Sequence, residues 1–440
     1  MTLHRGYYLT PPSCYNAFML NRPSHDWQAR LDEVIAERTA QMIKLRRHLH
    51  SYPEPSGEEF KTSLHLYQTL VEEGFEVLMG PEGRGVIADD RFVADGQDLP
   101  CIALRADIDA LRIHDQKDVE YKSRCPGLMH ACGHDSHSAA VFGASAAIRQ
   151  MQQSGNLPWP IRFRSVFQPA EETSTGAKEM IEAGAIDGVE AIAAIHMDPS
   201  RRVGTVGLRD GVLTANCVGM RIRIVGRGGH TARPHEACDP IAAAAQLINA
   251  LYLFIPRVTD SQDAVVLGIG QIHSGDNPNV IPERLELRGT LRTLDRKVHK
   301  EAIKHIRRLA HGIGQTTDTH IDVQFEQASG AVVNQPQLMA VVRESARHVV
   351  GGEGMIEIPR PSMGSEDFSF YLDHIPGAMI RVGCASAERG RSPLHSPDFD
   401  IDEDALAVAA RILARVVIEW SNPHRKEAID PTEVDAGSGI

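Results

Sequence analysis

The sequence predicts an α/β fold in which a mostly parallel sheet carries a smaller, inserted α+β domain. Apolar segments of strand length alternate with helical segments over residues 101–195, and this order builds parallel sheets. From about Thr214 the strands alternate apolar and polar residues, which is typical of antiparallel strands with one exposed face. Helical segments return from Asn334 onward. The α+β segment is therefore predicted to interrupt the first domain.

The composition is that of a soluble globular protein. The 440 residues suffice for two domains, and 42% hydrophobic and 24% charged residues are ordinary proportions. A net charge of -12 argues against nonspecific nucleic-acid binding, and no apolar run approaches the roughly 18 residues of a membrane span. The first 26 residues lack a secretory signal, and the seven cysteines are irregularly spaced. We therefore expect a cytoplasmic protein without a nucleic-acid or membrane partner.

Periodicity and turn residues define the elements of the first domain. Residues 27–49 carry apolar side chains at helical spacing, and the helix should end before Pro53. A second helix, 63–74, closes on Gly74. A third, 136–151, is rich in the Ala and Gly that allow close packing against a sheet. The other elements expected here are strands 101–105, 161–167 and 189–195 and the helix 177–183.

The inserted segment has the element order of a ferredoxin-like unit. Strand, helix, strand, strand, helix and strand are expected at residues 218–225, 239–254, 264–272, 284–292, 295–312 and 321–325. Two helices of the first domain are expected within residues 334–421. The predicted limits are an N-terminal arm at 1–26, the first domain at 27–214 and 326–421, the inserted domain at 215–325, and a flexible tail at 422–440.

One stretch, residues 128–138, places a thiol and three imidazoles within eight positions. Cys132 and His134 can reach one ion or one side each of a pair, and zinc takes such ligands readily. Other polar residues fall at or just after the ends of the predicted parallel strands, where such sheets bind ligands. With that stretch, the set is Asp107, Cys132, His134, Glu171, Glu172 and His196. Taken alone, the stretch fits a His-rich helix start with a buried cysteine equally well.

A hydrolytic metal centre needs ligands, a general base and open coordination positions. The candidate ligands are Cys132, His134, Glu172, His196 and His395, from four separate segments. Because five ligands exceed one tetrahedral site, we expect two divalent ions bridged by one ligand and a water. Glu171, beside Glu172, should have a raised pKa suited to a general base, although acidic pairs also occur at helix starts. Around them we expect carboxylates that orient histidines or cap helices at Asp107 and Asp135, and structural imidazoles at His130 and His137.

These segments resemble the M20 family of metallopeptidases, specifically its amidohydrolase subgroup of aminoacylases, hippurate hydrolases and indole-acetyl-amino-acid hydrolases. The matching segments recur in order between about residue 30 and residue 420. They are Arg46-Arg-His-Leu-His-Ser-Tyr-Pro-Glu54, Arg105-Ala-Asp-Ile-Asp-Ala-Leu111, His130-Ala-Cys-Gly-His-Asp135, Phe167-Gln-Pro-Ala-Glu-Glu172, Gly228-Gly-His230, Asn279-Val-Ile-Pro282, Gly289-Thr-Leu-Arg-Thr293, Ser365-Glu-Asp-Phe-Ser369 and Leu394-His-Ser-Pro397. One departure is Arg112, which stands where the family usually has proline.

The resemblance implies a catalytic domain of the zinc-exopeptidase type with an inserted lid through which many members dimerise, so a homodimer or a larger assembly is expected. Cys132 would replace the bridging aspartate of other M20 branches, the other four candidates would be the remaining ligands, and Glu171 would be the general base. His230 of the lid would help to stabilise the oxyanion, in several relatives from the partner subunit. Asn279 and Arg292 would hold the substrate carboxylate. Members use zinc, manganese, cobalt or nickel, and this ligand set does not decide among them.

The expected reaction is hydrolysis of an N-acyl amino acid, such as a hippurate-like, N-acetyl or aryl-acyl compound. A metal-bound hydroxide, formed with the help of Glu171, would attack the amide carbonyl, and Glu171 would return the proton to the leaving amine. The alternatives are a dipeptidase or carboxypeptidase on the same two-metal scaffold, and a nonenzymatic metal-binding protein. A dinucleotide site at residues 226–230 is disfavoured because the third glycine spacing and a surrounding βαβ unit are missing.

Overall fold

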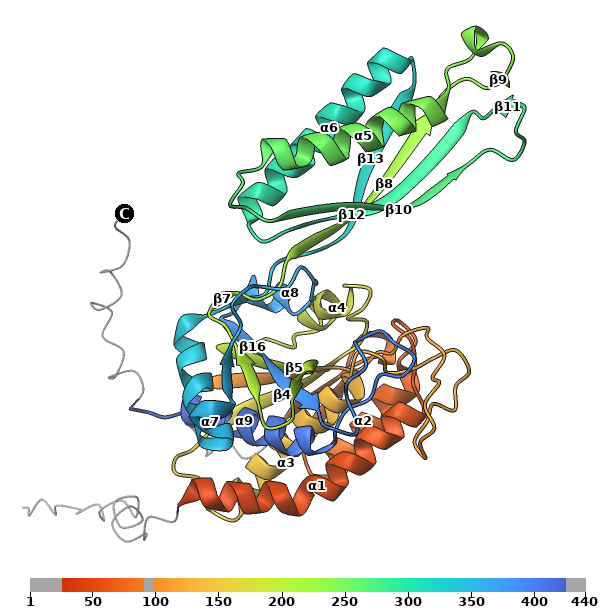
Figure 1. Ribbon diagram of the computed structural model, residues 1–440. Helices are drawn as coiled ribbons and strands as arrows, with labels where there is room; N and C mark the ends of the chain where they lie inside the picture. Colours follow the sequence, from red (N-terminus) through yellow and green to blue (C-terminus); the bar gives the residue numbers. More distant parts are fainter. Residues whose placement is uncertain (1–25, 91–98, 425–440) are drawn as a thin grey trace, which may run out of the picture.

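The structure is a computed structural model that describes residues 26–90 and 99–424 (Figure 1). The predicted N-terminal arm lies outside the described residues apart from Asp26, and so does most of the predicted tail. Asp26 begins the first helix. Its side chain accepts hydrogen bonds from the backbone N–H groups of Gln28 and Ala29, which is the pattern of an N-cap.

The central sheet has eight strands in the order β1-β2-β4-β3-β5-β16-β6-β15. Its middle four strands, β4 (Arg162–Gln168), β3 (Cys101–Asp107), β5 (Ala191–Arg202) and β16 (Gly377–Ala385), run parallel. The outer strands are β1 (Glu76–Met79), β2 (Val86–Asp89), β6 (Val206–Leu208) and β15 (Met355–Glu357). Every residue of β3 is buried, as expected for a strand covered on both faces. The predicted α/β fold with a mostly parallel sheet is confirmed.

Helices cover both faces of this sheet (Figure 1). One face carries α1 (Trp27–Ser51), α3 (His134–Gln153), α7 (Pro336–Gly354) and α9 (Asp404–Trp420). The other face carries α4 (Gly176–Glu182) and α8 (Ser369–Leu372), whereas α2 (Phe60–Glu72) packs beside β1 and β2. The helix α3 approaches α1 closely because Gly143 leaves room for Met42: a Cβ at Gly143 would lie 2.0 Å from the Met42 sulfur.

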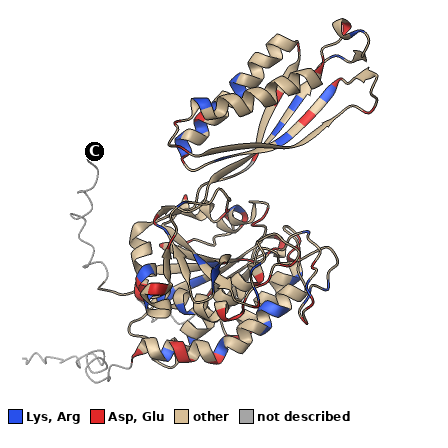
Figure 2. Ribbon diagram, in the orientation of Figure 1, with Lys and Arg blue, Asp and Glu red and all other residues tan. Residues whose placement is uncertain are grey.

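A second sheet with its own hydrophobic core forms what we call the small unit. It comprises β8 (Asn216–Val225), α5 (Pro240–Val258), β10 (Val265–Ser274), β12 (Arg284–Thr293), α6 (Arg296–Thr317) and β13 (His320–Ser329). The strand order β10-β12-β8-β13, all antiparallel, is that of a ferredoxin-like unit. The two helices cover one face (Figure 1). Charged residues of both signs lie along the strands of this sheet (Figure 2), and Glu286 pairs with Arg223 and Arg288.

The helix α5 differs from the expectation that no segment resembles a membrane span. In the described part of the chain it alone is long and apolar enough to cross a membrane by length and composition. Its buried residues, which include Ala243, Leu247 and Leu251, pack on the sheet of the small unit. The apolar character of α5 therefore serves this core on one side and leaves an exposed apolar surface on the other.

The short elements connect these layers. They are the strands β7 (Gly211–Val212), β9 (Gly229–His230), β11 (Val280–Ile281) and β14 (Val333–Asn334) and the 3-10 helices η1 (Pro81–Gly83) and η2 (Pro234–Glu236). The strands β9 and β11 pair at the end of the small unit that lies farthest from the central sheet (Figure 1). The strand β16 was not predicted, although it pairs with β5 in the middle of the central sheet.

Candidate metal centre

The structure brings the five predicted metal ligands together. Cys132 Sγ lies 3.5 Å from His196 Nε2. His395 Nε2 lies 3.3 Å and His134 Nε2 lies 3.9 Å from the same oxygen, Glu172 Oε1. Ligand-type atoms of Cys132, Glu172 and His395 all lie within 4.8 Å of one another, and so do those of His134, Glu171 and Glu172. Four segments far apart in the sequence therefore meet in one cluster.

The fold positions these side chains at the carboxyl ends of the parallel strands, as predicted. The strand β4 ends three residues before Glu171, and the helix α3 begins at His134. His196 lies within β5 rather than at its end, two residues beyond Ala194, where the pairing of β5 with β3 stops. His395 has a left-handed backbone (φ 62°), and its N–H donates to Ala131 O at 2.8 Å, which holds the loop beside Cys132.

Two buried atoms in this cluster lack hydrogen-bond partners among the described residues. They are His134 Nε2 and Glu172 Oε1. The other nitrogen of His134, Nδ1, lies 2.9 Å from Asp109 O and 3.0 Å from Asp109 Oδ1, so it donates to Asp109 and leaves Nε2 as a lone-pair donor. A buried imidazole nitrogen and a buried carboxylate oxygen 3.9 Å apart are donors that a divalent cation would satisfy together. The donor set of thiol, imidazoles and carboxylate suits divalent transition metals.

Glu171 is placed to hold a proton. Its side chain is 9% exposed, and its Oε1 accepts a hydrogen bond from Asp367 N at 3.3 Å. Burial, followed by the charges of Glu366, Asp367 and Glu172, raises the pKa of Glu171 well above its usual range. The carboxylate oxygens of Glu171, Glu366 and Asp367 lie within 4.8 Å of one another. This is the raised pKa expected of a general base beside other carboxylates.

The two predicted orienting carboxylates have different surroundings. Asp107 Oδ1 lies 2.6 Å from His137 Nδ1, and its Oδ2 lies 3.8 Å from His134 Nε2, so Asp107 borders the ligand cluster. Asp135 instead accepts from Arg46 Nε at 3.1 Å and from His50 Nδ1 at 2.7 Å. The expectation that Asp135 orients a ligand histidine is therefore corrected: its side chain turns away from the ligands, toward the buried Arg46.

The predicted structural role of His137 agrees with its contacts. Its Nδ1 lies 2.6 Å from Asp107 Oδ1, and its Nε2 accepts a hydrogen bond from Met197 N at 2.9 Å, so neither nitrogen is free for a metal. His130 is also buried, but both of its nitrogens lack partners among the described residues. Burial lowers the pKa of His130 to about 4, and this keeps the imidazole neutral.

Sequence analysis missed two residues that organise the site. Asp109 holds His134 through Oδ1, and its Oδ2 accepts from Ser56 Oγ at 2.6 Å and from Glu172 N at 3.0 Å. Arg105 is buried and joins Asp107 (2.7 Å) to Asp367 (2.8 Å). Both lie in the segment 105–111 that was singled out, so the signal that could have found them was a second acid and a lone arginine in an otherwise apolar strand end.

Among the described residues, the ligand cluster does not include His230, Asn279 or Arg292. His230 is exposed on β9, and its Nδ1 accepts from Ala232 N at 3.0 Å. Asn279 is exposed beside β11, at the far end of the small unit (Figure 1). Arg292 lies near the central sheet instead, and its Nη1 donates to Met363 O at 2.8 Å, just before the segment 365–369.

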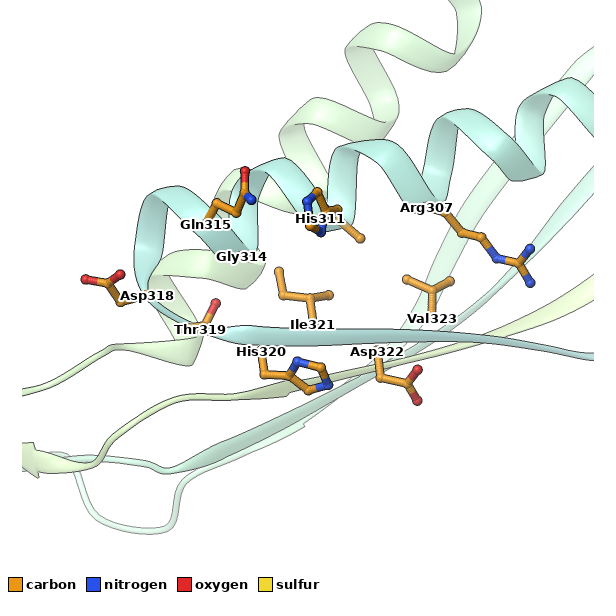
Figure 3. Close-up of a pocket in the computed structure, with 11 residues that line it drawn as sticks. Arg307, His311, Gly314, Gln315, Asp318, Thr319, His320, Ile321, Asp322 and Val323 are labelled. Carbon is orange, nitrogen blue, oxygen red and sulfur yellow. The ribbon is translucent and has the colours of Figure 1, made fainter.

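A groove of about 660 Å³ lies between α6 and β13 in the small unit (Figure 3). Its lining includes Arg307, His311, Asp318 and His320. None of the candidate ligands, orienting acids or substrate-binding residues lines it. The groove is therefore separate from the metal cluster.

A family description, peptidase family M20/M25/M40, matches residues 103–419. The chain belongs to this family. An N-acetyl-L-cysteine deacetylase of Bacillus subtilis is 38% identical over 373 residues, which span 85% of this M20 chain and 86% of that protein. Thermostable carboxypeptidase 1 of Saccharolobus solfataricus is 34% identical over 407 residues, covering 90% of this chain and 100% of the carboxypeptidase.

One solved relative is described with two metal ions. The YXEP protein of Bacillus subtilis, described as a dinuclear metal binding peptidase from the M20 family, is 33% identical. Its structure matches with a TM-score of 0.73, over 88% of this chain and 99% of that one. Together, family membership and the ligand cluster make the M20 chain a metal-dependent hydrolase of amides.

Proposed function

We propose that this M20 hydrolase cleaves the amide bond of N-acyl amino acids with the help of two divalent cations. One observation carries the proposal: the buried Glu171, with its raised pKa, stands beside His134 Nε2 and Glu172 Oε1, two buried ligand atoms that have no hydrogen-bond partner in the part of the chain that the structure describes. A carboxylate with a raised pKa adjacent to a cation site can take a proton from water and return it to the leaving amine, which suits amide hydrolysis by water. The similarity to N-acetylcysteine deacetylases supports an N-acyl substrate.

Five residues would hold the cations: Cys132, His134, Glu172, His196 and His395. Bound there, divalent ions would polarise the amide carbonyl and lower the pKa of water. Zinc, manganese, cobalt and nickel all accept thiolate, imidazole and carboxylate donors, so the proposal is for two divalent ions of this group.

The side chains of this chain supply the proton transfers. Glu171 takes the proton from the attacking water and delivers it to the amine as the carbon–nitrogen bond breaks. Asp367 holds Glu171 through its backbone N–H, while Asp109 fixes the ring plane of His134. We propose that Arg292 and Asn279 bind the substrate carboxylate and that His230 donates a hydrogen bond to the oxyanion.

A carboxypeptidase or dipeptidase activity on the same site is the second candidate. The similarity to the Saccharolobus carboxypeptidase, which spans that protein's whole length, favours it. Both activities release a free amino acid, and they differ only in the group on the acyl side of the cleaved bond. The same metal ligands and the same general base would serve either reaction.

The substrate class can be tested by hydrolysis of matched amides after reconstitution with Zn²⁺, Mn²⁺, Co²⁺ or Ni²⁺. We expect cleavage of hippurate or N-acetyl amino acids at a kcat/KM at least about tenfold above that for the corresponding dipeptides. Activity should disappear with a chelator and return with added metal. Dipeptides as the better substrates would favour the second candidate, and activity that survives the chelator would contradict metal dependence.

We propose that residues 215–325 form a lid through which two chains dimerise, while residues 27–214 and 326–421 form the catalytic domain. The strand β10 is an open edge of the small sheet. Beside it, α5 exposes Leu253 and Phe254, which are 66% and 52% exposed. An open strand edge next to exposed apolar side chains favours association with a second copy. The exposed His230, far from its own metal cluster, would then reach the site of the partner subunit.

Complementation between subunits tests this arrangement. Dimers built from one His230→Ala chain and one Glu171→Gln chain should recover about half of the wild-type activity, because one of the two sites keeps both groups. Each variant alone should be nearly inactive. Two affinity tags isolate the mixed dimer after co-expression. A mixed dimer as inactive as its parents would show that His230 acts within its own chain, and a fully active His230→Ala enzyme would remove it from the mechanism.

The cytoplasm is the proposed location. In the described ranges every cysteine is free, including the buried Cys101, Cys132 and Cys384. Free thiols are the ordinary state in a reducing compartment, and a thiol ligand to a metal needs one.

A further inference from the structure

The two adjacent glutamates follow a backbone turn that non-glycine residues rarely adopt. Ala170, immediately before Glu171, has φ 51°, and Ser174 has φ 56°. Both values lie in the left-handed region, where an L side chain crowds its own backbone. The direction in which Glu171 and Glu172 leave β4 depends on Ala170, because its φ sets the path of the chain after Gln168 and Pro169. Something must hold Ala170 in this conformation.

Neighbouring backbone groups bind the carbonyl of Ala170. Its carbonyl accepts from Thr175 N at 3.3 Å and from Gly176 N at 3.2 Å. These bonds lie within the turn and close it locally. The backbone N–H of Ala170, on the strand side of the turn, is not bonded within the turn and needs an acceptor from another segment.

Glu59 holds that N–H from a distant segment. Its Oε1 accepts from Ala170 N at 2.8 Å, across 111 positions of the chain, and from Gly57 N at 2.9 Å. Glu59 precedes α2 at the N-cap position but makes no side-chain cap there. The side chain is fully buried, and its second oxygen, Oε2, has no hydrogen-bond partner among the described residues and only a long ion pair, 3.8 Å, with Arg84 Nη1. Burying a carboxyl group in this way is costly, so the contact with Ala170 needs a reason beyond the stability of α2.

Resting on the proposed function, we propose that Glu59 is a positioning residue for the hydrolytic site. It holds Ala170 in the left-handed conformation and thereby aims Glu171 as the base and Glu172 as the ligand. Glu59 touches neither the substrate nor the cations, and it acts only through the turn at Ala170. The bond that Asp109 makes to Glu172 N fixes the next part of the same turn.

The protonation of Glu59 fits an acceptor that does not need a charge. Burial, followed by the nearby Asp109, raises the pKa of Glu59 to about 7. Its Oε1 can accept from Ala170 N in either protonation state, because a proton on the neutral form can sit on Oε2, which lies 3.8 Å from Arg84 Nη1. Glu59→Gln therefore keeps the acceptor and should behave nearly as wild type. Glu59→Asp, which is one methylene shorter, should lose the reach to Ala170.

Glycine at position 170 gives a direct test, because glycine adopts the left-handed region without steric cost. Glu59→Ala should lower kcat about tenfold to a hundredfold and weaken Zn²⁺ binding by about tenfold, the usual effect of losing a group that orients a ligand. Adding Ala170→Gly should recover most of both losses. Zn²⁺ affinity is measured by competition with a chromophoric chelator, without substrate. If Glu59→Ala fails to fold, Glu59→Asp with and without Ala170→Gly gives the same comparison.

Ser174→Gly is the matched control, since Ser174 has a similar left-handed backbone, whereas the hydrogen bonds of Glu59 Oε1 in the described residues go to Ala170 N and Gly57 N. It should not rescue Glu59→Ala. Equal rescue by Ser174→Gly and Ala170→Gly would overturn the proposal, and so would wild-type kcat and Zn²⁺ affinity in both Glu59→Ala and Glu59→Asp. Failure of the wild-type enzyme to hydrolyse N-acyl amino acids would instead contradict the proposed function. The Zn²⁺ affinities of Glu59→Ala with and without Ala170→Gly would still decide the role of Glu59.

Discussion

Glu171→Gln is expected to lower kcat by about 10³-fold while both metal ions stay bound. That loss corresponds to about 4 kcal/mol of barrier, within the range for removal of a general base. Glutamine keeps the shape of the side chain and an oxygen that can accept from Asp367 N, but it can take no proton from water. KM should change little, because Glu171 is assigned to proton transfer and not to binding the substrate.

Metal content and steady-state kinetics on the same preparation check this expectation. Glu190→Gln is a suitable control, because Glu190 is an exposed acid outside the cluster, and it should match the wild type in both measurements. A Glu171→Gln enzyme within about tenfold of wild-type kcat would show that another group moves the proton. Glu366, which lies in the same buried acidic group, would then be the next residue to test. Loss of metal in Glu171→Gln would instead make Glu171 a ligand.

The fold could be predicted wherever the local pattern agrees with the tertiary structure. The helix expected at 27–49 is α1 (Trp27–Ser51), and it ends before Pro53 as the proline requires. The strand β16 could not be predicted in this way. Its first residue, Gly377, must be small because a Cβ there would lie 2.9 Å from Ile192 O. A glycine that serves strand packing looks the same in the sequence as a glycine that ends a strand, so only the pairing with β5 identifies β16.

The candidate ligands could be predicted because their chemistry is local and distinctive. Cys132 and His134 stand two apart, and Glu171 and Glu172 are adjacent, so few alternatives arise. The supporting contacts could not be predicted. Asp109 joins Ser56, His134 and Glu172 from three separate segments, and the sequence gives no reason to prefer Asp109 over Asp107 for His134. Asp135 is next to the ligand His134 in the sequence, but its carboxylate contacts Arg46 and His50 from another helix. Only the fold reveals these contacts.

Cys132→Ala is expected to abolish the paired metal site. The sulfur of Cys132 lies 3.5 Å from His196 Nε2 and within 4.8 Å of the ligand atoms of Glu172 and His395. It thus lies between His196 on one side and the pair formed by Glu172 and His395 on the other. Metal content should fall from the proposed two ions per chain to one or none, and amide hydrolysis should fall by at least about 10³-fold, since the two proposed ions would share the tasks of binding the carbonyl and activating the water.

Two further variants separate this role from general damage to the core. Cys384→Ala removes a buried thiol from β16, outside the cluster, and should keep both metals and most of the activity. Cys132→Asp restores a negative ligand of similar reach and should retain more metal than Cys132→Ala, because a carboxylate can also bridge two ions. Two bound ions in Cys132→Ala would show that the remaining four ligands suffice. A Cys132→Asp enzyme without metal would mean that the site depends on sulfur itself, in which case the soft thiolate would also narrow the choice of metal toward zinc.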